Sequence, residues 1–355
     1  MKQKIIAAMM TLLLVIGLTP VFAVDVGTGV GIDIETEDFA PTVYIDSDTR
    51  LLVDDNTPTG RNAPGVDLAG VRVNNYAFEG EKVSWTVLVH DRNGIETLTS
   101  NPAVTVGPTQ GEGNDVEALC DVGVQLAGGA ALTEFGVRDG PDALTFNLDT
   151  MRIYACILTV ESPASMDGEF WVTAEATDSS GLMGTSSQNE FWWFNPVIAL
   201  DIDGALDFGT VRPGATSYSS TLTVGNGASP GSGVLLDMFI SGTDFTDPVS
   251  SAAKCPTTNE LDLGNFGYLA TNGAHSSFTG AADAEGYRPI PNGVRITEAD
   301  QVMTGDDYLA SAIDLASGNV LSPGAEMSVT LRLGLPNPCN GDFTDGSIFF
   351  WGEAV

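Results

Sequence analysis

The chain contains few basic residues. Only 14 Lys and Arg stand against 47 Asp and Glu among its 355 residues, and the formal net charge is −33. Nucleic-acid affinity rests on Lys and Arg side chains that neutralise phosphates, and attraction to an anionic membrane surface needs basic clusters. We therefore expect neither nucleic acid nor an anionic membrane surface among its partners.

Histidine is nearly absent, and the cysteines are not closely spaced. His90 and His275 are the only histidines, and no C-x-x-C pair occurs. Structural zinc sites need close Cys and His pairs, so the sequence argues against one. The lack of a recognisable base, nucleophile or metal cluster also argues against an enzyme. His90 ends an alternating stretch beside a turn, and we expect it to be solvated.

The four cysteines form an even set, which is typical of disulfides in an oxidising compartment. Three pairings are possible, and four buried thiols are a further alternative. We expect the pairing that keeps each disulfide within one half of the chain, namely Cys120 with Cys156 and Cys255 with Cys339.

One long apolar run is present, near the N-terminus. Lys2 and Lys4 precede an apolar core over residues 5–18, and Pro20 and Ala23 follow it, which predicts a signal peptide over residues 1–23. The core is shorter than the roughly 18 to 20 residues of a spanning helix. We expect cleavage and a secreted or cell-surface protein, with a retained membrane anchor as the alternative.

The remaining chain alternates with period two. Residues 83–90, 154–160, 170–176 and 327–333 are short alternating stretches, and 41 Gly and 18 Pro interrupt the chain between such stretches. This pattern predicts an all-β fold of antiparallel, Ig-like β-sandwiches. Residues 297–316 alone could form a short helix.

Pro196 suggests a boundary between two domains. We predict an extended N-terminal segment at residues 24–40, one Ig-like sandwich at 41–194 and a second at 196–355. The aromatic residues at 191–194 end the first domain. Because a strand points them to both faces, we expect them to pack internally, with a sugar-binding platform as the alternative.

Residues 24–34 are Gly-rich and alternating. They are expected to form a first strand or a loose tail. A sharper hypothesis is a donor strand that completes the sheet of a neighbouring subunit, since glycine permits close backbone approach.

One motif is of a type that occurs in hydrolases. Residues 227–231 match G-x-S-x-G, but Pro230 and Gly231 follow Ser229, so the helix that a nucleophile elbow requires is not expected. A glycosidase needs only two carboxylates at no fixed spacing, so no motif tests it. A secreted hydrolase is therefore a distant third hypothesis.

Acidic residues gather in the predicted loops. Converging Asp and Asn loops could supply the six to eight oxygens of a calcium site, whereas the same residues beside Gly are also typical turn formers, the interpretation that we favour. No cofactor is required, and calcium is the one considered. Its candidate ligands are Asp46, Asp48, Asp54, Asp55, Asp91 and Asp178.

Several segments resemble known families. Residues 85–95 and 170–181, with an A-x-D-x-x-G turn, resemble prokaryotic Ig-like surface modules. Residues 206–214 and 222–226 resemble Ig-like domains with an F-G-x-V-x-P-G…V-x-N signature. With residues 77–81 and 254–259, the chain resembles exported two-domain proteins of small-genome, DPANN-type archaea. The resemblance implies two Ig-like domains and supplies no catalytic residue.

These observations favour an exported structural protein of the cell envelope or extracellular space without catalytic activity. Its expected partners are further copies of itself or other envelope proteins. The alternative is a secreted adhesin or receptor-type binding module that calcium stabilises. The sequence contains no Asn-x-Ser/Thr sequon, so N-glycosylation is not expected.

Overall fold

The structure is a computed structural model that describes most of the chain. The described residues are 35–46, 51–53, 68, 72, 74–111, 116–135, 144–186, 188–249, 252–278, 284–293, 301–303 and 318–355. The chain divides into two units, Met1–Asp38 and Phe39–Val355. The predicted signal peptide and residues 24–34 lie outside the described residues, and so does the predicted helix apart from residues 301–303.

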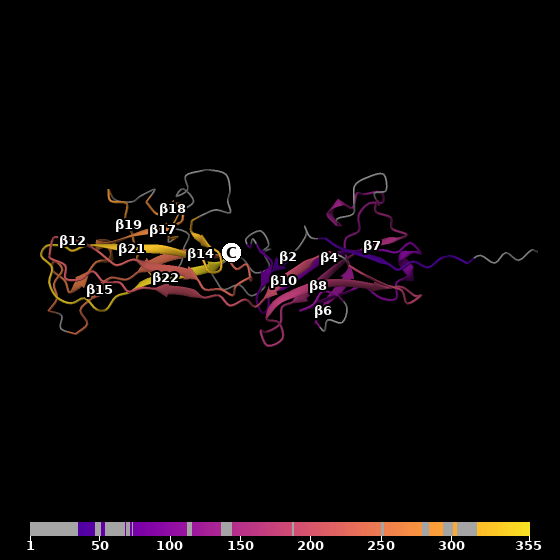
Figure 1. Cartoon of the computed structure of the whole chain (residues 1–355), viewed down its shortest axis with the longest axis horizontal. Helices are drawn as coiled ribbons and strands as arrows, with labels where there is room; N and C mark the ends of the chain where they lie inside the picture. The colour runs from indigo at the N-terminus through magenta and orange to yellow at the C-terminus, as the bar shows by residue number, and fades with distance from the viewer. Residues whose placement is uncertain are drawn as a thin grey trace, which may run out of the picture. The chain divides into compact units, whose positions relative to one another are not determined.

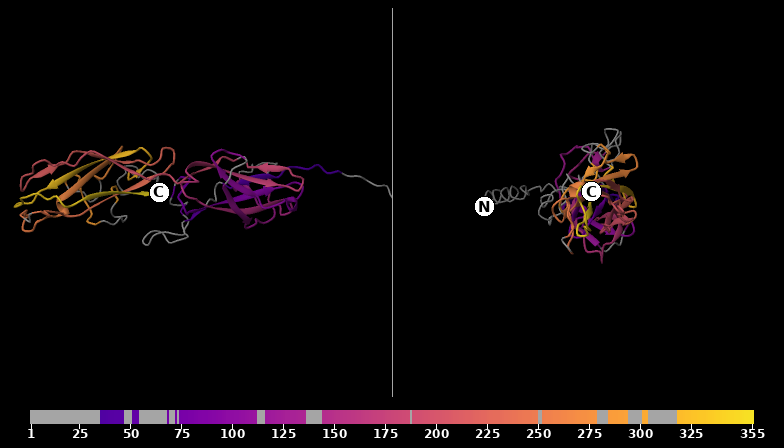
Figure 2. Two further views of the ribbon diagram at one scale, coloured as in Figure 1. Left: turned by 90° about the horizontal axis from the view of Figure 1, so that it is seen from below. Right: turned by 90° about the vertical axis from the view of Figure 1, so that its left-hand side faces the viewer.

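The described residues are almost entirely strands and loops, as the coloured ribbon in Figures 1 and 2 shows. Their helical elements are three single 3-10 turns, η1 (Ile95–Thr97), η2 (Thr133–Phe135) and η3 (Leu263–Asn265). The all-β prediction is confirmed. Within the described ranges, no helix has the length and apolarity that crossing a membrane requires.

Ten strands precede residue 195 in the described part of the chain, and we call them the first strand group. They form one sheet path, β1-β4-β7-β6-β5-β8-β10-β3, with β2 beside β4 and β9 beside β8. All pairs are antiparallel except β10 with β3. The strands are β1 (Thr42–Ile45), β2 (Leu51–Val53), β3 (Tyr76–Ala77), β4 (Lys82–His90), β5 (Ala103–Gly107), β6 (Val116–Val122), β7 (Met151–Thr159), β8 (Gly168–Thr177), β9 (Met183–Thr185) and β10 (Glu190–Phe194).

The two ends of this path pack face to face around one core. The alternation predicted for residues 83–90 places Trp85 of β4 inward, where it is 1% exposed. Its ring meets that of Trp192 of β10 edge to face, with 6.2 Å between centroids. Burial of such large apolar side chains is the main favourable term of folding.

Among the described residues after 195, twelve strands are present, and we call them the second strand group. They form a seven-stranded sheet with the path β11-β13-β21-β17-β18 and with β12 beside β21 and β19 beside β17, a three-stranded sheet β20-β14-β22 and a two-stranded sheet β15-β16. The strands are β11 (Leu200–Asp203), β12 (Thr216–Tyr218), β13 (Leu222–Asn226), β14 (Leu236–Gly242), β15 (Phe245–Thr246), β16 (Glu260–Leu261), β17 (Phe266–Asn272), β18 (His275–Ser276), β19 (Arg288–Pro289), β20 (Val320–Leu321), β21 (Glu326–Gly334) and β22 (Ile348–Ala354).

The alternation predicted for residues 327–333 is also observed. Met327, Val329 and Leu331 of β21 have no exposed surface and lie in the core of the second strand group. Tyr76 of the first strand group is buried in that same core, where Phe78 and Trp193 also pack. The Ig-like class of each strand group and its standing as a separate domain stay predictions.

Each strand group contains one disulfide. Cys120 and Cys156 are opposite each other on β6 and β7, and Cys255 bonds Cys339 between two loops, with sequence separations of 36 and 84 residues. In the chain-entropy account, bridges of these spans each stabilise the fold by about 3.5 to 4.5 kcal/mol. The structure therefore contains two disulfides, each within one half of the chain.

Candidate functional site

The aromatic strand β10 presents a different pair of side chains to each of its faces. Trp192 and Phe194 are 3% and 0% exposed in the core of the first strand group. Phe191 is 44% exposed on the opposite face, and Trp193 is partly buried there. Internal packing, the expectation from the sequence, thus describes Trp192 and Phe194 in the first core and Trp193 against the second core, while Phe191 on the same face as Trp193 stays exposed.

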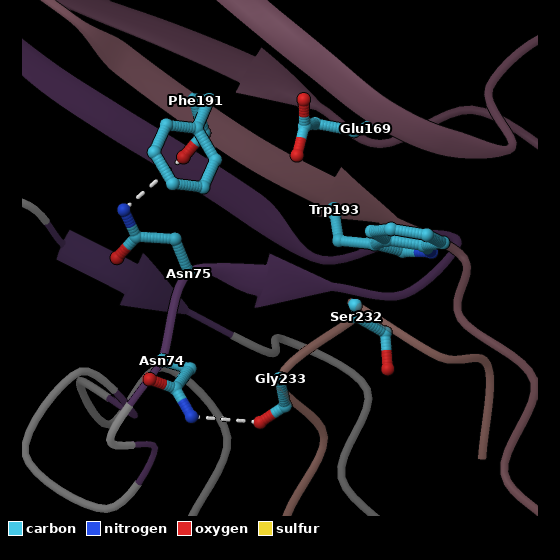
Figure 3. Close-up of a pocket in the computed structure, with 8 residues that line it drawn as sticks. Asn74, Asn75, Glu169, Phe191, Trp193, Ser232 and Gly233 are labelled. Atoms are coloured by element: carbon cyan, nitrogen blue, oxygen red, sulfur yellow. Dashed lines mark hydrogen bonds between the residues drawn. The ribbon is translucent and has the colours of Figure 1, made fainter. Parts of the chain in front are cut away.

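Phe191 and Trp193 line a cavity of about 340 Å³ (Figure 3). β8 and β10 supply one wall, residues 74 and 75 before β3 a second, and the loop before β14 a third. The lining residues are Asn74, Asn75, Glu169, Phe191, Trp193, Gly231, Ser232 and Gly233.

Glycine permits the close approach of the loop before β14. Gly231 and Gly233 have positive φ angles of 86° and 71°, which side chains other than that of glycine rarely adopt. A Cβ atom on Gly231 would lie 3.3 Å from Cζ3 of Trp193, and one on Gly233 would lie 3.1 Å from Cβ of Asn74. The tryptophan ring therefore lies against the loop backbone.

Two asparagine side chains are held at the rim of the cavity. The amide nitrogen of Asn74 donates to the carbonyl oxygen of Gly233 at 2.8 Å, and that of Asn75 donates to the carbonyl oxygen of Phe191 at 3.1 Å. Glu169 is exposed and lies directly opposite Trp193 in the β8–β10 register. The cavity thus combines aromatic surface, amide groups and one carboxylate.

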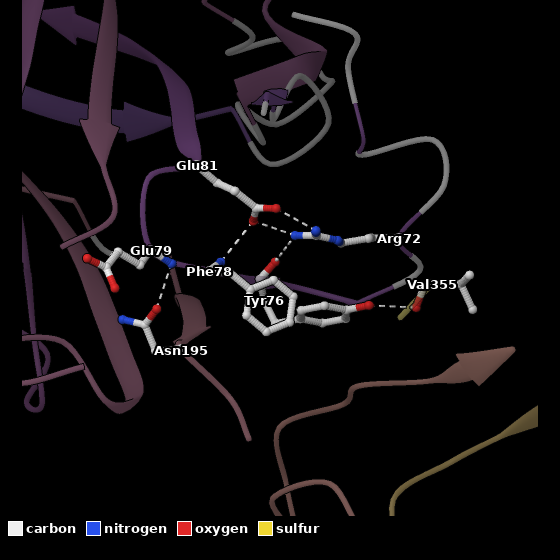
Figure 4. A network of polar contacts seen from close by, with 7 residues as sticks. All are labelled: Arg72, Tyr76, Phe78, Glu79, Glu81, Asn195 and Val355. Carbon is white, nitrogen blue, oxygen red and sulfur yellow. Dashed lines mark hydrogen bonds and ion pairs between the residues drawn. The ribbon is translucent and has the colours of Figure 1, made fainter. Parts of the chain in front are cut away.

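Arg72 and Glu81 form a buried ion pair, and Arg72 is two residues before Asn74, which lines the cavity (Figure 4). Arg72 donates two hydrogen bonds to Glu81, of 2.6 and 2.5 Å, and the side chains are 11% and 7% exposed. The guanidinium carbon lies 5.0 Å from the ring centroids of both Tyr76 and Phe78. The bidentate geometry and the two rings compensate the charge of Arg72 away from water.

Tyr76 connects this ion pair to the second strand group. Its hydroxyl donates to the Val355 oxygen at 2.9 Å, and the carboxylate of Glu81 accepts the backbone N–H of Phe78 at 2.8 Å. Burial is the main cause that raises the pKa of Tyr76 to about 12. In the folded protein, Tyr76 therefore remains neutral at the pH values near 10 at which an exposed tyrosine begins to ionise.

The Tyr76→Phe variant should change how stability depends on alkaline pH. The unfolded tyrosine ionises near pH 10 and the folded one near pH 12, so unfolding releases a proton in this window and wild-type stability falls there. The loss is about 1.4 kcal/mol per pH unit, or roughly 2 to 3 kcal/mol in all.

Urea unfolding of both proteins between pH 8 and about pH 12 measures this effect. At pH 8 the variant should be less stable by about 1 kcal/mol, because the hydrogen bond to Val355 is lost. The other tyrosines contribute to both curves, so the difference should shrink and then reverse above pH 10. Parallel curves would contradict the raised pKa.

Asn195 directly follows the strand β10. It is the only described residue other than glycine with a positive φ, of 49°. Its side-chain oxygen accepts the N–H of Glu79 at 2.7 Å, and its amide nitrogen donates to the carbonyl oxygens of Glu161 and Met166 at 2.8 and 2.6 Å. One side chain thus joins three segments of the first strand group at its exit.

The candidate calcium ligands do not all lie together. Asp91 and Asp178 both flank Thr97, whose hydroxyl donates to Asp91 and whose carbonyl oxygen accepts the N–H of Ser179, each at 2.8 Å. Asp46 lies at the opposite end of β1, where its N–H donates to Thr86. The remaining candidates, Asp48, Asp54 and Asp55, lie outside the described residues.

The two aspartates near Thr97 act as turn residues. Asp91 accepts the backbone N–H of Asn93 at 2.8 Å, and Asp178 accepts those of Ser180 and Leu182 at 2.9 and 2.8 Å. Asp and Asn commonly form such bonds two residues ahead. Among the described residues, no three His, Cys, Asp or Glu side chains are grouped so as to hold a metal ion, and calcium binding stays a prediction.

Two further expectations have structural outcomes. The G-x-S-x-G loop lies between β13 and β14, and turns follow Ser229 where a nucleophile elbow would need a helix. The side chain of Asn226 donates hydrogen bonds to the carbonyl oxygens of Val234 and Leu321 at the ends of this loop region. The expectation that His90 is solvated is wrong. It is 9% exposed at the end of β4, and burial lowers its pKa below the ordinary value.

Sequence reasoning missed the ion pair and the polar lining of the cavity. Arg72 and Glu81 are nine residues apart with no periodic signal between them. Strict alternation over residues 191–194 predicts that Phe191 and Trp193 point away from the core of the first strand group. It could not have found Glu169, which faces them from another strand.

Comparison with known proteins gives a faint structural likeness. No protein-family model and no curated protein match the chain. Among solved structures, one match is the C-terminal domain of the Streptococcus pyogenes antigen I/II-family protein AspA, with 9% identity over 90% of this chain and 97% of that one. Its TM-score is 0.28, and at that value the likeness carries no argument about fold or function.

Proposed function

We propose that the protein is an exported structural component of the cell envelope or extracellular space, that it self-associates, and that it has no catalytic activity. The two disulfides support an oxidising compartment. A net charge of −33 suits a solvated surface and keeps the protein soluble. An open edge of the second strand group carries the proposal that it self-associates.

The open edge is formed by β11 and β22. In the described ranges, β22 pairs with β14 alone, and β11 is the terminal strand of the seven-stranded sheet. A Cβ atom on Gly352 of β22 would lie 3.2 Å from a methyl carbon of Leu200 of β11. The edge strands of the two sheets therefore lie against each other on one side.

Apolar side chains are incompletely covered along this edge. Ile202 of β11 is 50% exposed. On one face of β22, Ile348 and Phe350 pack against the core but stay partly exposed. On the other face, the ring centroids of Phe349 and Trp351 lie 5.9 Å apart. Strand edges with unpaired backbone groups are templates for strand addition, and added apolar contact would favour it.

We propose a second copy of the chain as the partner at this edge. The donor strand proposed for residues 24–34 suits the role, since alternating residues fill an edge and glycines permit close approach. Other envelope proteins are the alternative partners.

Size-exclusion chromatography with light scattering on the mature chain tests self-association. We expect dimers or larger species at micromolar to millimolar concentrations. Ile202→Lys and Phe349→Lys should give monomers, because a charge at the edge opposes strand pairing. Leu119→Lys on β6, where the residue is 82% exposed, is the matched control and should assemble as wild type does.

Removal of residues 24–36 tests the donor strand separately. Loss of assembly in this deletion and in both edge variants would support strand donation. A wild-type protein that remains monomeric at every concentration would contradict the proposal, as would dissociation by Leu119→Lys alone.

A secreted adhesin or receptor-type binding module is the second candidate function. The observation that favours it is the cavity beside Phe191 and Trp193, which places exposed aromatic surface next to polar groups. Ligand binding by monomers of the edge variants would separate this function from the structural one.

A further inference from the structure

We propose that the cavity lined by Phe191 and Trp193 binds a neutral oligosaccharide. The two rings form the stacking surface, and Glu169 with the neighbouring amides bonds the sugar hydroxyls. This inference does not depend on self-association, because the open edge and the cavity share no residue.

The aromatic surface extends over two strands. In the β8–β10 register, Phe191 is opposite Trp171 and Trp193 is opposite Glu169. The rings of Trp171 and Phe191 lie 5.7 Å apart. Paired strand residues point to the same face, so three aromatic side chains and one carboxylate form a block on the face of β8 and β10 turned away from the first core.

The ring of Trp193 is held in place before any ligand arrives. The strand backbone positions Phe191, and the ring of Trp193 lies against Gly231. Little side-chain freedom then remains to be lost on binding, which preserves affinity. The 44% of Phe191 that stays in water is apolar area that a ligand could cover.

The polar lining indicates the class of ligand. A sugar ring has apolar C–H faces that stack on aromatic rings and hydroxyl edges that both donate and accept hydrogen bonds. The amides of Asn74 and Asn75 and the carboxylate of Glu169 are groups of the type that bonds hydroxyls (Figure 3).

Charge and size narrow the class further. Among the described lining residues, Glu169 alone is charged, and the chain carries a net charge of −33, so phosphates and acidic sugars are repelled. The cavity of about 340 Å³ lies at the small end of the range of ligand pockets, about 300 to 1,000 Å³. It fits one or two rings of a longer neutral chain.

A quaternary ammonium ion is the competing ligand, because aromatic rings near a carboxylate also attract cations. Amide groups at the rim favour hydroxyls over an ammonium group, which has no acceptor or donor to satisfy them. Choline is therefore included as a separate arm of the test.

Calorimetry and tryptophan fluorescence on the full mature chain provide that test. The probes are neutral trisaccharides of α-1,4-glucose, β-1,4-glucose, β-1,4-N-acetylglucosamine and mannose. We expect saturable binding of at least one, weakened about tenfold in Phe191→Ala and in Trp193→Ala. Glu169→Gln should weaken binding by a smaller factor, because the amide retains one acceptor.

Phe278→Ala is the matched control, because Phe278 is 59% exposed and outside the cavity lining. It should bind as wild type does. Trp193 also packs against the second core, so Phe191→Ala, at an exposed position, keeps the test valid if the tryptophan variant fails to fold. Absence of binding to all four trisaccharides, binding of choline alone, or unchanged affinity in Phe191→Ala would overturn the proposal.

Discussion

Glu81→Gln should lower the free energy of unfolding by about 3 to 5 kcal/mol. The change leaves the guanidinium of Arg72 buried, at 11% exposure, without the carboxylate that it contacts at 2.6 and 2.5 Å (Figure 4). It also weakens the acceptor for the N–H of Phe78. Urea unfolding followed by tryptophan fluorescence measures the loss.

The exposed pair of Arg332 and Glu285 provides the control. Its side chains are 26% and 52% exposed, and the nitrogen and oxygen lie 3.2 Å apart. Glu285→Gln should cost less than about 1 kcal/mol, because water screens exposed pairs. An equal cost at both sites would show that the burial of Glu81 is not what makes its pair important.

A double variant separates the loss of the pair from the unpaired charge. Arg72→Met with Glu81→Leu removes both charges and keeps apolar volume, so most of the stability should return. A double variant as unstable as Glu81→Gln would show that the bonds themselves, rather than an uncompensated charge, carry the effect.

Asn195→Ala should lower the free energy of unfolding by about 4 to 5 kcal/mol. It removes three side-chain hydrogen bonds, to Glu79, Glu161 and Met166, and leaves their backbone groups without this partner. Alanine at the φ of 49° adds strain of about 1 to 2 kcal/mol. Thermal and urea unfolding measure the total.

Asn195→Gly divides this cost into its two parts. Glycine adopts the positive φ without strain, so this variant should be more stable than Asn195→Ala by about 1 kcal/mol. Asn265→Ala, which loses one exposed bond to Asp262 at ordinary φ, is the control and should cost less than about 1 kcal/mol. Equal stability of the glycine and alanine variants would contradict a role for backbone strain.

The alternating pattern was sufficient for the fold class but not for strand order. Residues 83–90 and 327–333 alternate in the sequence and bury the predicted faces in β4 and β21. Alternation is a local property of the chain. It does not contain the register that places Cys120 opposite Cys156, which depends on how two distant strands meet.

The acidic loops show how far the sequence can predict the role of individual aspartates. Asp91 and Asp178 precede turns, and the sequence alone predicted turn formation at both, while calcium binding stays a separate prediction. The structure adds that both residues flank Thr97 and that Oδ1 of each carboxylate accepts backbone N–H groups, while Oδ2 of Asp91 accepts the Thr97 hydroxyl. Local hydrogen bonding decides this arrangement, which is why residue types alone indicated it.

The sequence by itself determined that few basic residues are available, that the cysteines can pair, and that the chain forms strands. Only the tertiary structure decided what covers each face of β10. Alternation predicts which residues share a face of a strand, but it does not predict which other segments pack against that face. The loop at residues 231–233 approaches that strand from the second strand group and leaves a cavity beside Trp193. The ion pair of Arg72 with Glu81 has the same origin, since burial by distant segments makes a charge pair matter.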